Sequence, residues 1–475
     1  SLHESGFGNI IVQPNVKKAL EYYIQAATKQ HEPSMMKVGE ILGGMLGCHE
    51  EAIHWFKKTS RSYPENVMAK VMLISYELQG FDCGLSVESN KDTSNFKLLR
   101  HIVAQYNTDE SNQEDLLQDK EEEEEEENPL SRRRNELCSK KNGMGHAYYI
   151  LGQCYEFGRG TSVDLLASID AYEIAVSSCD HIDAMWRLGM VYSYRFDDDS
   201  SALDWFRKAS EKARHRDSHY QLGLFHLRGR GGLEINLAAA KRYFTKAAEQ
   251  NHAMATYELA RILWTIDSSH LKAYELFERA AQQNVPGALC HLGHFSYTGL
   301  YYRSICVVEK DLQKAFAYYS EAAQAGDPIA ALMVGSHFED KGNLDRALQW
   351  YESSYRLGGG GLAELAIGKI KHCMSQTDPH AQEEAIAWFE SAAADDMLKR
   401  QSVFSAHVMI ALYHLNGWGN RDKDSQKGFQ MLLKIANMGG TEVFSLLAEC
   451  YKEGIGKEHH QDNTSNLEKA ASDEA

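Results

Sequence analysis

The chain has 475 residues, of which 43% are hydrophobic and 25% are charged, and its formal net charge is −17. A single hydrophobic core rarely grows beyond about 300 residues, so this length excludes one ordinary globular domain and leaves several domains or an open-ended repeat array. The acidic balance argues against nucleic acid as a partner, because contact with phosphates requires a basic surface.

The composition favours helices and a reducing compartment. Only 7 prolines occur, and Ala, Leu, Glu and Lys are abundant. The 9 cysteines are odd in number and contain no CxxC pair, which is typical of reduced thiols in the cytosol or nucleus. No run of about 18 apolar residues could span a bilayer. We therefore expect no direct membrane insertion in this segment and a cytoplasmic location, with cortical or nuclear placement through partners.

One helical pattern recurs from the start of the chain almost to its end. It reads small-x-x-aromatic-aromatic-x-x-small-small, and its clearest copy is Ala202–Ser210. The second aromatic position is occupied in turn by Tyr23, Phe56, Tyr172, Phe206, Phe244, Phe277, Tyr319, Tyr351, Phe389 and, more loosely, Leu432. All intervals except one lie between 32 and 43 residues. A fixed period of this length is the signature of a helical repeat array.

A second motif precedes most of these helices and reads Leu-Gly-x-x-Tyr-x-x-Gly-x-Gly, as at Leu151–Gly160. Its last glycines are expected to end a first helix, because glycine adopts a left-handed backbone without strain. Asp164 and Asn236 should then cap the second helix of their repeats. Each repeat is thus predicted to be two helices, and successive units must stack because one pair cannot bury its apolar face alone.

The single long interval, 116 residues between Phe56 and Tyr172, has a different composition. Residues 68–80 and 96–106 read as one further, degenerate helix pair. Between residues 107 and 141 a run of seven glutamates, Glu121–Glu127, is followed by clustered arginines and lysines. Such charge blocks repel and offer no core, so we predict a disordered insertion. A kinase substrate or a nuclear-import patch is the alternative to a plain solvated linker.

The predicted organisation has three parts. N-terminal repeats occupy residues 1–106, the insertion 107–141 and a C-terminal repeat array 142–475. Both ends read as cut through repeats, because residues 6–8 match a Gly-x-Gly turn without a first helix, and Leu467–Ala471 starts a second helix just before the sequence stops. We therefore expect the chain to be a fragment of a longer protein.

The motif pair resembles the Sel-one-like repeat (SLR) family, a relative of the tetratricopeptide repeats, over about residues 6–471. The resemblance implies an all-α fold, namely a right-handed α/α superhelical solenoid of about 11–12 two-helix repeats with one disordered acidic insertion. It also implies that the partners are other proteins held on the concave face, with a homodimer through the solenoid as an alternative.

No residue is predicted to be catalytic, to bind a cofactor or to ligate a metal. His459 and His460 lack the three or four converging ligands of a zinc site. The stretch 228–232, Arg-Gly-Arg-Gly-Gly, resembles an RNA-binding element but falls where each repeat places its Gly-x-Gly turn. Gly358–Gly361 lacks the strand and the Gly-Lys-Ser/Thr of a phosphate loop and reads as a turn between helices. We therefore predict a protein that is not an enzyme.

The candidate partner-binding residues form a stripe. Two residues before the Leu of successive first helices lie Tyr149, Trp186, Tyr220 and Tyr257. If the first helices line the concave side, as in similar tetratricopeptide arrays, these rings point inward and could grip an extended peptide or a helix. The alternative is that they pack neighbouring repeats together, since aromatic stripes on helices more often belong to the core.

Two functions remain open from the sequence. The first is an adaptor or regulatory subunit. In the SLR family, fungal chitin-synthase activators and kinase-associated cell-cycle regulators carry long arrays of this type, so activation or localisation of a partner enzyme is implied. The second is the lumenal adaptor of endoplasmic-reticulum-associated degradation. The single glycosylation sequon, Asn463-Thr464-Ser465, and the odd thiols fit that alternative less well.

Overall fold

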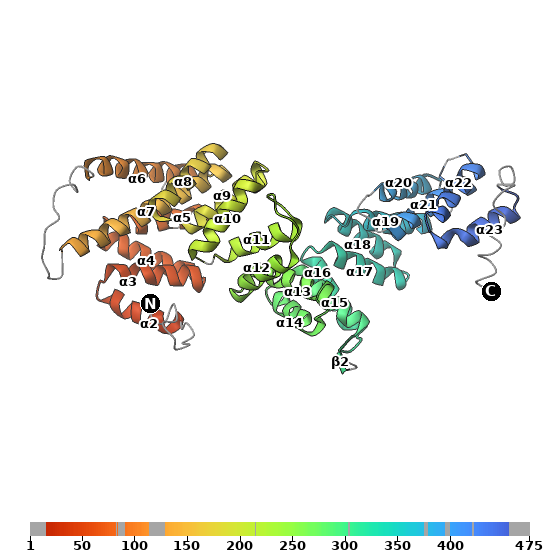
Figure 1. The fold of residues 1–475 in the computed structure, drawn as a ribbon, viewed down its shortest axis with the longest axis horizontal. Helices are drawn as coiled ribbons and strands as arrows, with labels where there is room; N and C mark the ends of the chain where they lie inside the picture. Colours follow the sequence, from red (N-terminus) through yellow and green to blue (C-terminus); the bar gives the residue numbers. More distant parts are fainter. Residues whose placement is uncertain are drawn as a thin grey trace. The chain divides into compact units, whose positions relative to one another are not determined.

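The computed structural model describes residues 16–81, 83, 91–113, 129–213, 215–302, 305–374, 379–394, 400–419 and 422–455 (Figure 1). Across these residues, 22 α-helices follow one another and pack pairwise. The predicted all-helical repeat solenoid is therefore confirmed. Three features of the sequence lie outside the described residues: the histidines His459 and His460, the sequon at Asn463 and the glutamate run 121–127.

The helices alternate between two roles, as the two sequence motifs predict. The first helices are α3 (Glu32–Glu40), α5 (Val67–Leu78), α7 (Pro129–Phe157), α9 (Ile182–Arg195), α11 (Arg216–Arg228), α13 (Ala253–Thr265), α15 (Pro286–Thr298), α17 (Pro328–Asp340), α19 (Gly360–Met374), α21 (Arg400–Asn416) and α23 (Phe444–Lys452). The second helices are α2 (Val16–Thr28), α4 (His49–Ser62), α6 (Lys91–Gln113), α8 (Leu165–Cys179), α10 (Asp199–Ala213), α12 (Leu237–Glu249), α14 (His270–Ala281), α16 (Leu312–Gln324), α18 (Leu344–Arg356), α20 (Pro379–Ala393) and α22 (Ser425–Asn437).

Seven of the repeats share a close contact between one glycine of the first helix and one aromatic ring of the second. In α9, a Cβ placed on Gly189 would lie 2.5 Å from the ring of Phe206, and Gly223 stands in the same relation to Phe244. Both rings are fully buried. The Gly of the Leu-Gly motif is thus required because its missing side chain lets the ring of the second helix lie against the first helix backbone.

Helix ends follow the predicted chemistry. The side chains of Asp164 and Asn236 accept the backbone N–H groups of Ala167 and Ala239, at 3.0 and 2.9 Å, and so cap α8 and α12. Gly229 ends α11 with φ of 65°, the left-handed conformation that favours glycine. The Arg-Gly-Arg-Gly-Gly stretch is therefore a repeat turn, as its position predicts.

Two local departures interrupt the helical pattern. The turn after α15 is widened into an antiparallel hairpin of β1 (Leu300–Tyr302) and β2 (Ile305–Val308), which accounts for the long interval before Tyr319. A π-helical turn, Ile41–Met45, extends α3, and a 3-10 turn, Thr441–Val443, precedes α23. In the described part of the chain, the hairpin is the only sheet.

Helix extends into both ends of the predicted insertion. The helix α6 runs to Gln113 and α7 starts at Pro129, so only residues 114–128 of the insertion lie outside the described part. A helix can continue past its packed region because each added residue gains one backbone hydrogen bond. The helices α5, α6 and α7 also pack on one another. Both α6 and α7 thus reach into the predicted insertion 107–141, and the three-part division stays a prediction.

The chain divides into two compact units, residues 1–252 and 253–475, called unit 1 and unit 2 below. Within each unit a first helix packs on the second helix of its own repeat and on the second helix of the repeat before it. Three of the four predicted stripe residues, Tyr149, Trp186 and Tyr220, belong to unit 1. The fourth, Tyr257, belongs to unit 2.

Candidate functional site

The four stripe residues are all half-buried, and each contacts a neighbouring repeat. The ring of Tyr149 stacks on that of His181 with centroids 4.5 Å apart, and Tyr220 stacks on His252 at the same distance. Trp186 lies tilted against His215 at 6.0 Å. These contacts support the packing alternative for the stripe in unit 1, while the predicted partner contact stays a prediction.

Tyr257, in unit 2, has different neighbours. Its ring contacts Phe277 and His291, each with centroids 6.0 Å away, and the guanidinium of Arg261 lies 5.8 Å from its centroid. Burial raises the pKa of Tyr257 to about 12, although the charge of the nearby Arg261 opposes this shift. This tyrosine therefore stays neutral at physiological pH.

A ladder of histidines and aspartates joins the repeats of unit 1. His181, His215 and His252 each lie seven residues before the Leu of a first helix, and His146, Asp183 and Asp217 each lie five residues before it. His215 Nε2 is 3.3 Å from Asp183 Oδ1, and His252 Nε2 is 3.2 Å from Asp217 Oδ1. Each of these histidines thus reaches back to a carboxylate of the preceding repeat.

The hydrogen bonds fix the tautomer of His181. Its Nδ1 accepts the backbone N–H of Ala184 at 3.3 Å and so caps α9. A neutral imidazole that accepts at Nδ1 carries its proton on Nε2, and this N–H donates to Nδ1 of His146 at 3.1 Å. His215 repeats the arrangement by accepting the N–H of Ser218 at 3.2 Å. One ring therefore both caps its own helix and ties it to the preceding repeat.

Burial keeps His146 and His181, the first two histidines of the ladder, neutral. Burial, together with the nearby His181, lowers the pKa of His146 to about 4. Burial also lowers the pKa of His181. The hydrogen bond from His215 lowers the pKa of Asp183, which stays ionised. The ladder is missing from the predicted site residues, although the histidine recurring seven residues before Leu in three successive repeats is a signal that the sequence carries.

Arg187 contacts two stripe residues, Tyr149 and Trp186, and also the exposed ring of Phe157. Its guanidinium carbon lies 5.0 Å from the ring centroids of both Trp186 and Phe157, and the group also hydrogen-bonds the hydroxyl of Tyr149. Nη1 is 3.5 Å from Oε1 of Glu156, whose side chain is only 6% exposed. The Arg187 side chain is 21% exposed and its Nε is buried, so only part of this planar group is accessible to a partner.

The carboxylate of Glu156 is anchored from the other side by the hydroxyl of Tyr172, which donates to it at 2.7 Å. Burial, and then the charge of Glu156, raises the pKa of Tyr172. Tyr172 is the fully buried ring of the second helix α8. The position of Arg187 is therefore fixed by the core of the repeat and not by exposed side chains.

Two exposed aromatic rings, one exposed arginine and the half-buried Arg230 lie in unit 1 near Arg187 in the repeat order. Phe157 is 41% exposed, and the guanidinium of Arg159 lies 5.6 Å from its ring. Tyr194 is 56% exposed and lies seven residues after Arg187 on α9, which places both on one helix face. Arg230 donates two hydrogen bonds to Asp199, at 2.6 and 2.7 Å, and these, with one that it donates to the hydroxyl oxygen of Tyr194, raise its pKa.

We call Phe157, Arg159, Arg187, Tyr194 and Arg230 the Arg187 surface. The residues that occupy the position of Phe157 and Tyr194 in the next three repeats are Arg228, Thr265 and Thr298. The repeat itself therefore does not require a ring at this position. Exposed aromatic side chains beside arginines are the composition typical of protein-binding hot spots.

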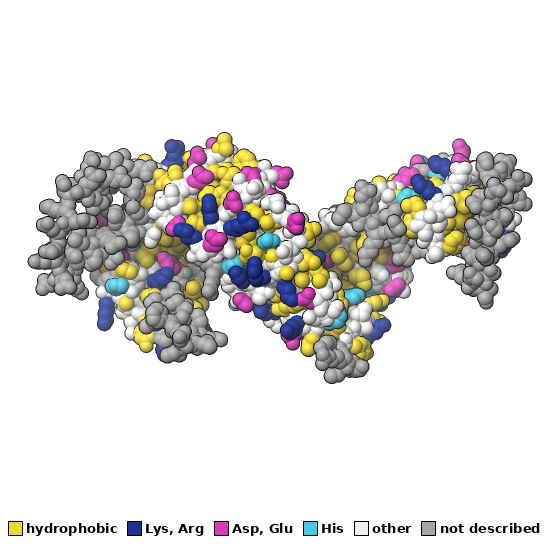
Figure 2. Space-filling view, in the orientation of Figure 1, with side chains coloured by type: hydrophobic (Ala, Val, Ile, Leu, Met, Phe, Trp, Pro, Cys, Tyr) yellow, Lys and Arg dark blue, Asp and Glu magenta, His cyan; other side chains and the backbone are white. Residues whose placement is uncertain are grey.

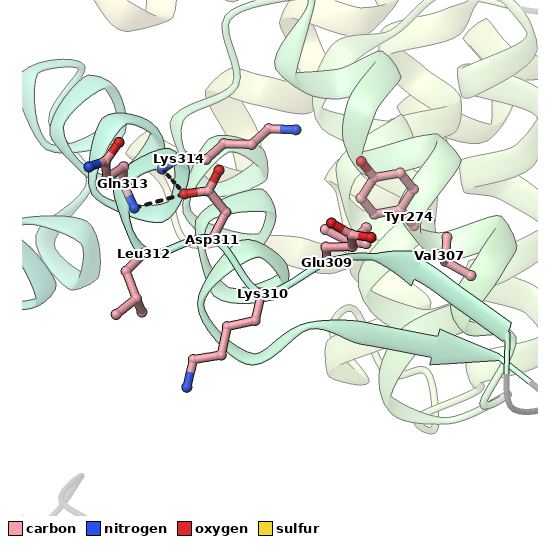
Figure 3. A pocket seen from close by; sticks show the side chains of 9 residues that line it. Tyr274, Val307, Glu309, Lys310, Asp311, Leu312, Gln313 and Lys314 are labelled. Carbon is pink, nitrogen blue, oxygen red and sulfur yellow. Dashed lines mark hydrogen bonds between the residues drawn. The ribbon is translucent and has the colours of Figure 1, made fainter.

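A hollow in unit 2 lies between Tyr274 and the segment Val307–Lys314, which follows the hairpin (Figure 3). Its volume is about 530 Å³. Asp311 points back into the start of α16, where it accepts the N–H groups of Gln313 and Lys314 at 2.9 Å each. The lining residues include no histidine, serine or cysteine that could act as a nucleophile or base beside these carboxylates.

Over the described ranges, no three or more His, Cys, Asp or Glu side chains converge as metal ligands would. None of the described helices is both long and apolar enough to cross a membrane. Eight cysteines in this part of the chain are free thiols: Cys48, Cys83, Cys154, Cys179, Cys290, Cys306, Cys373 and Cys450.

Comparison with known proteins gives one family match. The Sel1 repeat model matches residues 2–31, 49–62, 145–173, 182–213, 216–252, 253–285, 286–327, 328–359, 377–397 and 405–440. The matches cover more than half of the chain and fall on the helix pairs described above.

Three individual proteins are similar. The chitin synthase regulator SKT5 of Saccharomyces cerevisiae is 25% identical over 261 residues, 49% of this chain and 36% of that protein, so the chain spans about a third of its length. The fold resembles that of a protective antigen of uropathogenic Escherichia coli strains with an SLR fold, with a TM-score of 0.58 and 17% identity over 96% of this chain and 86% of that one. A Sel1 repeat protein from Oxalobacter formigenes is 25% identical over 46% of this chain and 93% of that one, with a TM-score of 0.41.

Proposed function

Because the chain belongs to the Sel1 repeat family, we propose that it is a non-catalytic adaptor or regulatory subunit that binds a segment of a partner protein on the Arg187 surface. The proposal does not depend on any reactive group. It depends on a rigid repeat scaffold that holds exposed rings and arginines in fixed positions, which lowers the entropy lost on binding.

The observation that carries the proposal is the environment of Phe157. A large apolar ring that is 41% exposed sits within 5.0 Å of Arg187 and 5.6 Å of Arg159. Arg187 is held by the buried carboxylate of Glu156. An apolar side chain of a partner could lie on the ring while its backbone or carboxylates accept from the two guanidinium groups.

The stripe is proposed to support this surface. Tyr149 and Trp186 both contact Arg187, so they would fix the guanidinium from beneath and add partner contact only at their exposed edges. Tyr220 and Tyr257 are proposed to make the equivalent packing contacts in the repeats that follow. Loss of a stripe ring would then weaken binding indirectly, through the position of Arg187.

The similarity to a chitin synthase regulator supports a partner that is an enzyme regulated or localised by this chain, with a chitin synthase or a kinase as candidates. A cytoplasmic location is part of the proposal. It is supported by the eight free thiols of the described residues, which suit a reducing compartment better than the lumen of the endoplasmic reticulum.

The proposal is tested by proximity labelling in cells with the full chain fused to a biotin ligase. The wild type is compared with Phe157→Ser plus Tyr194→Ser, which removes both exposed rings, and with Tyr301→Ser, which removes a 62% exposed ring from β1. We expect the double variant to lose a reproducible set of neighbours that the Tyr301→Ser control retains. Identical neighbours for all three proteins would refute the Arg187 surface, and catalytic turnover by the purified chain would refute the adaptor.

A further inference from the structure

A second charged surface lies on the second helices of unit 1, away from the first-helix positions used above. It consists of Arg207 and Lys208 on α10 and Arg242 and Lys246 on α12, and we call it the α10–α12 basic surface. All four side chains are exposed. Figure 2 shows lysine and arginine side chains gathered over α10, α11 and α12, with single acidic side chains between them.

These cations are ordered by aromatic rings beneath them. Lys208 Nζ lies 3.9 Å from the centroid of the Trp205 ring. The charged ends of Arg242 and Lys246 each lie 5.7 Å from the centroid of Tyr243. Cation–π contacts of this kind hold long side chains in place while their outer faces stay available. Three of the four charges, those of Lys208, Arg242 and Lys246, are therefore held more rigidly than free surface cations would be.

His226, at the end of α11, lies close enough to this surface for its positive charges to act on the imidazole ring. Its ring stacks on Tyr243 with centroids 5.4 Å apart and planes inclined by 12°. Burial lowers the pKa of His226, and the charges of Arg207 and Arg242 lower it further. Cations from two different helices thus act on one imidazole between them.

Only one of the four cations forms an ion pair among the described residues. Arg207 is 3.7 Å from Asp204, and both side chains are well exposed. For Lys208, Arg242 and Lys246, no ion pair is found within the described part of the chain. The chain as a whole carries a net charge of −17. The four cations outnumber the three exposed carboxylates that lie within four residues of them on α10 and α12, those of Asp204, Glu211 and Glu249, so this surface is locally basic on an acidic chain.

We propose that the α10–α12 basic surface binds an acidic peptide segment of a partner protein. Its arginines can each bind a carboxylate through two hydrogen bonds, and the lysines supply point charges on either side. A second copy of the chain is the weaker candidate, because two molecules of charge −17 repel each other. Nucleic acid is disfavoured for the same reason, since four cations cannot offset the acidic field along a phosphate backbone.

The surface would make the chain a connector with two separate docking sites. The Arg187 surface uses first helices and exposed rings, whereas the α10–α12 basic surface uses second helices and charge. The two can be disabled by different substitutions, so each proposal can fail without the other. Binding through charge should also respond to salt, which binding through apolar rings should do much less.

The test measures binding of a fluorescein-labelled peptide with the sequence of residues 119–129, which contains the seven glutamates, by fluorescence anisotropy with the full chain. The double variant Arg242→Glu plus Lys246→Glu should raise the dissociation constant by about tenfold or more. The matched control is Lys314→Glu, which reverses an exposed lysine 5.8 Å from the centroid of Tyr318 on a second helix of unit 2. It should leave the constant nearly unchanged.

A second readout separates binding from folding. Addition of the peptide should raise the pKa of His226, measured by NMR, because carboxylates would offset the charges of Arg207 and Arg242. Equal loss of binding in the Lys314→Glu control, or no change at His226, would overturn the proposal. Salt-sensitive self-association of the wild type that is lost in Arg242→Glu would reassign the surface to a second copy. Tighter binding of a seven-nucleotide uridine RNA would reassign it to nucleic acid.

Discussion

The ring of Tyr149 stacks on that of His181 with centroids 4.5 Å apart and planes inclined by 21°. This contact joins the first helices of two successive repeats, and Tyr220 and His252 form its counterpart two repeats later. Because His181 caps α9 and also hydrogen-bonds His146 of the preceding repeat, we expect this interface of unit 1 to respond to proton binding.

Unit 1 should lose stability as the pH falls from about 6.5 to about 4. Burial lowers the pKa of His146 from 6.5 to about 4 and also lowers that of His181. The unfolded state therefore binds protons first as the pH decreases, so the free energy of unfolding falls over this window and is fully retained above it. Protonation of His181 would also place a proton on Nδ1, the atom that caps α9.

Urea unfolding followed by circular dichroism, at several values between about pH 7 and pH 4.5, measures this dependence. The variant His146→Gln cannot take up a proton at this position and should show a shallower slope. A free energy of unfolding that is flat or rises as the pH falls would contradict the role given to the ladder.

Removal of the contact between glycine and ring should be costly. Gly189→Ala would place a Cβ 2.5 Å from the Phe206 ring, and overpacking of this kind typically costs about 1–3 kcal/mol. Gly44→Ala is the matched control because no atom lies within 4 Å of its Cβ, so it should be neutral or stabilising by up to about 1 kcal/mol. Thermal unfolding distinguishes the two, and equal effects would refute the packing argument.

The ion pair of Arg230 and Asp199 should stabilise unit 1 measurably, because it is partly shielded and makes two short hydrogen bonds. We expect Asp199→Asn to cost about 1–2 kcal/mol, since a partly buried guanidinium loses its counter-charge. The control is Lys212→Ala, which removes an ion pair of 2.7 Å to Asp180 with both side chains at least half exposed, and should cost less than about 0.5 kcal/mol. A chemical denaturation series compares them, and a larger loss for Lys212→Ala would be inconsistent with this assignment.

The stripe residues should contribute more to stability than to direct binding. Trp186→Ala plus Tyr220→Ala removes two rings that contact histidines of the next repeat, and truncation of half-buried aromatic side chains should cost several kcal/mol in total. Trp186→Phe is the control, because it keeps a ring and removes an indole N–H that is buried without an acceptor in the described residues. If the double variant abolishes partner binding while its melting temperature is unchanged, the stripe is a direct contact.

The sequence predicted the helix pairs, the turns and the caps because each depends on local chemistry. Gly229 ends α11 where the Gly-x-Gly motif places it, and Asp164 caps α8. The hairpin at Leu300–Val308 was not predicted, because it replaces a turn by a pairing that no repeated motif encodes. The predicted insertion 107–141 overlaps the end of α6 and the start of α7, because no repeated motif marks where these two helices end and begin.

The candidate site was predicted only in part. The position of Tyr149 and Trp186 on first helices follows from the Leu-Gly spacing, but their neighbours do not. Arg187 meets Glu156 and Phe157 across a repeat interface, and such a contact depends on how two repeats pack. Sequence spacing within one repeat cannot show which side chains of the next repeat it will touch.

Site-specific photo-crosslinking shows whether the Arg187 surface holds a partner protein. A benzophenone amino acid is placed at Tyr194, or at Tyr301 as the control with similar exposure. We expect the crosslinker at Tyr194 to form one discrete protein adduct that the crosslinker at Tyr301 does not form. Excess unlabelled wild-type chain should suppress this adduct, whereas excess unlabelled Phe157→Ser variant should not. Two results would contradict this role of the Arg187 surface. One is equal adducts from both positions, and the other is an adduct that excess Phe157→Ser variant suppresses as well as excess wild type does.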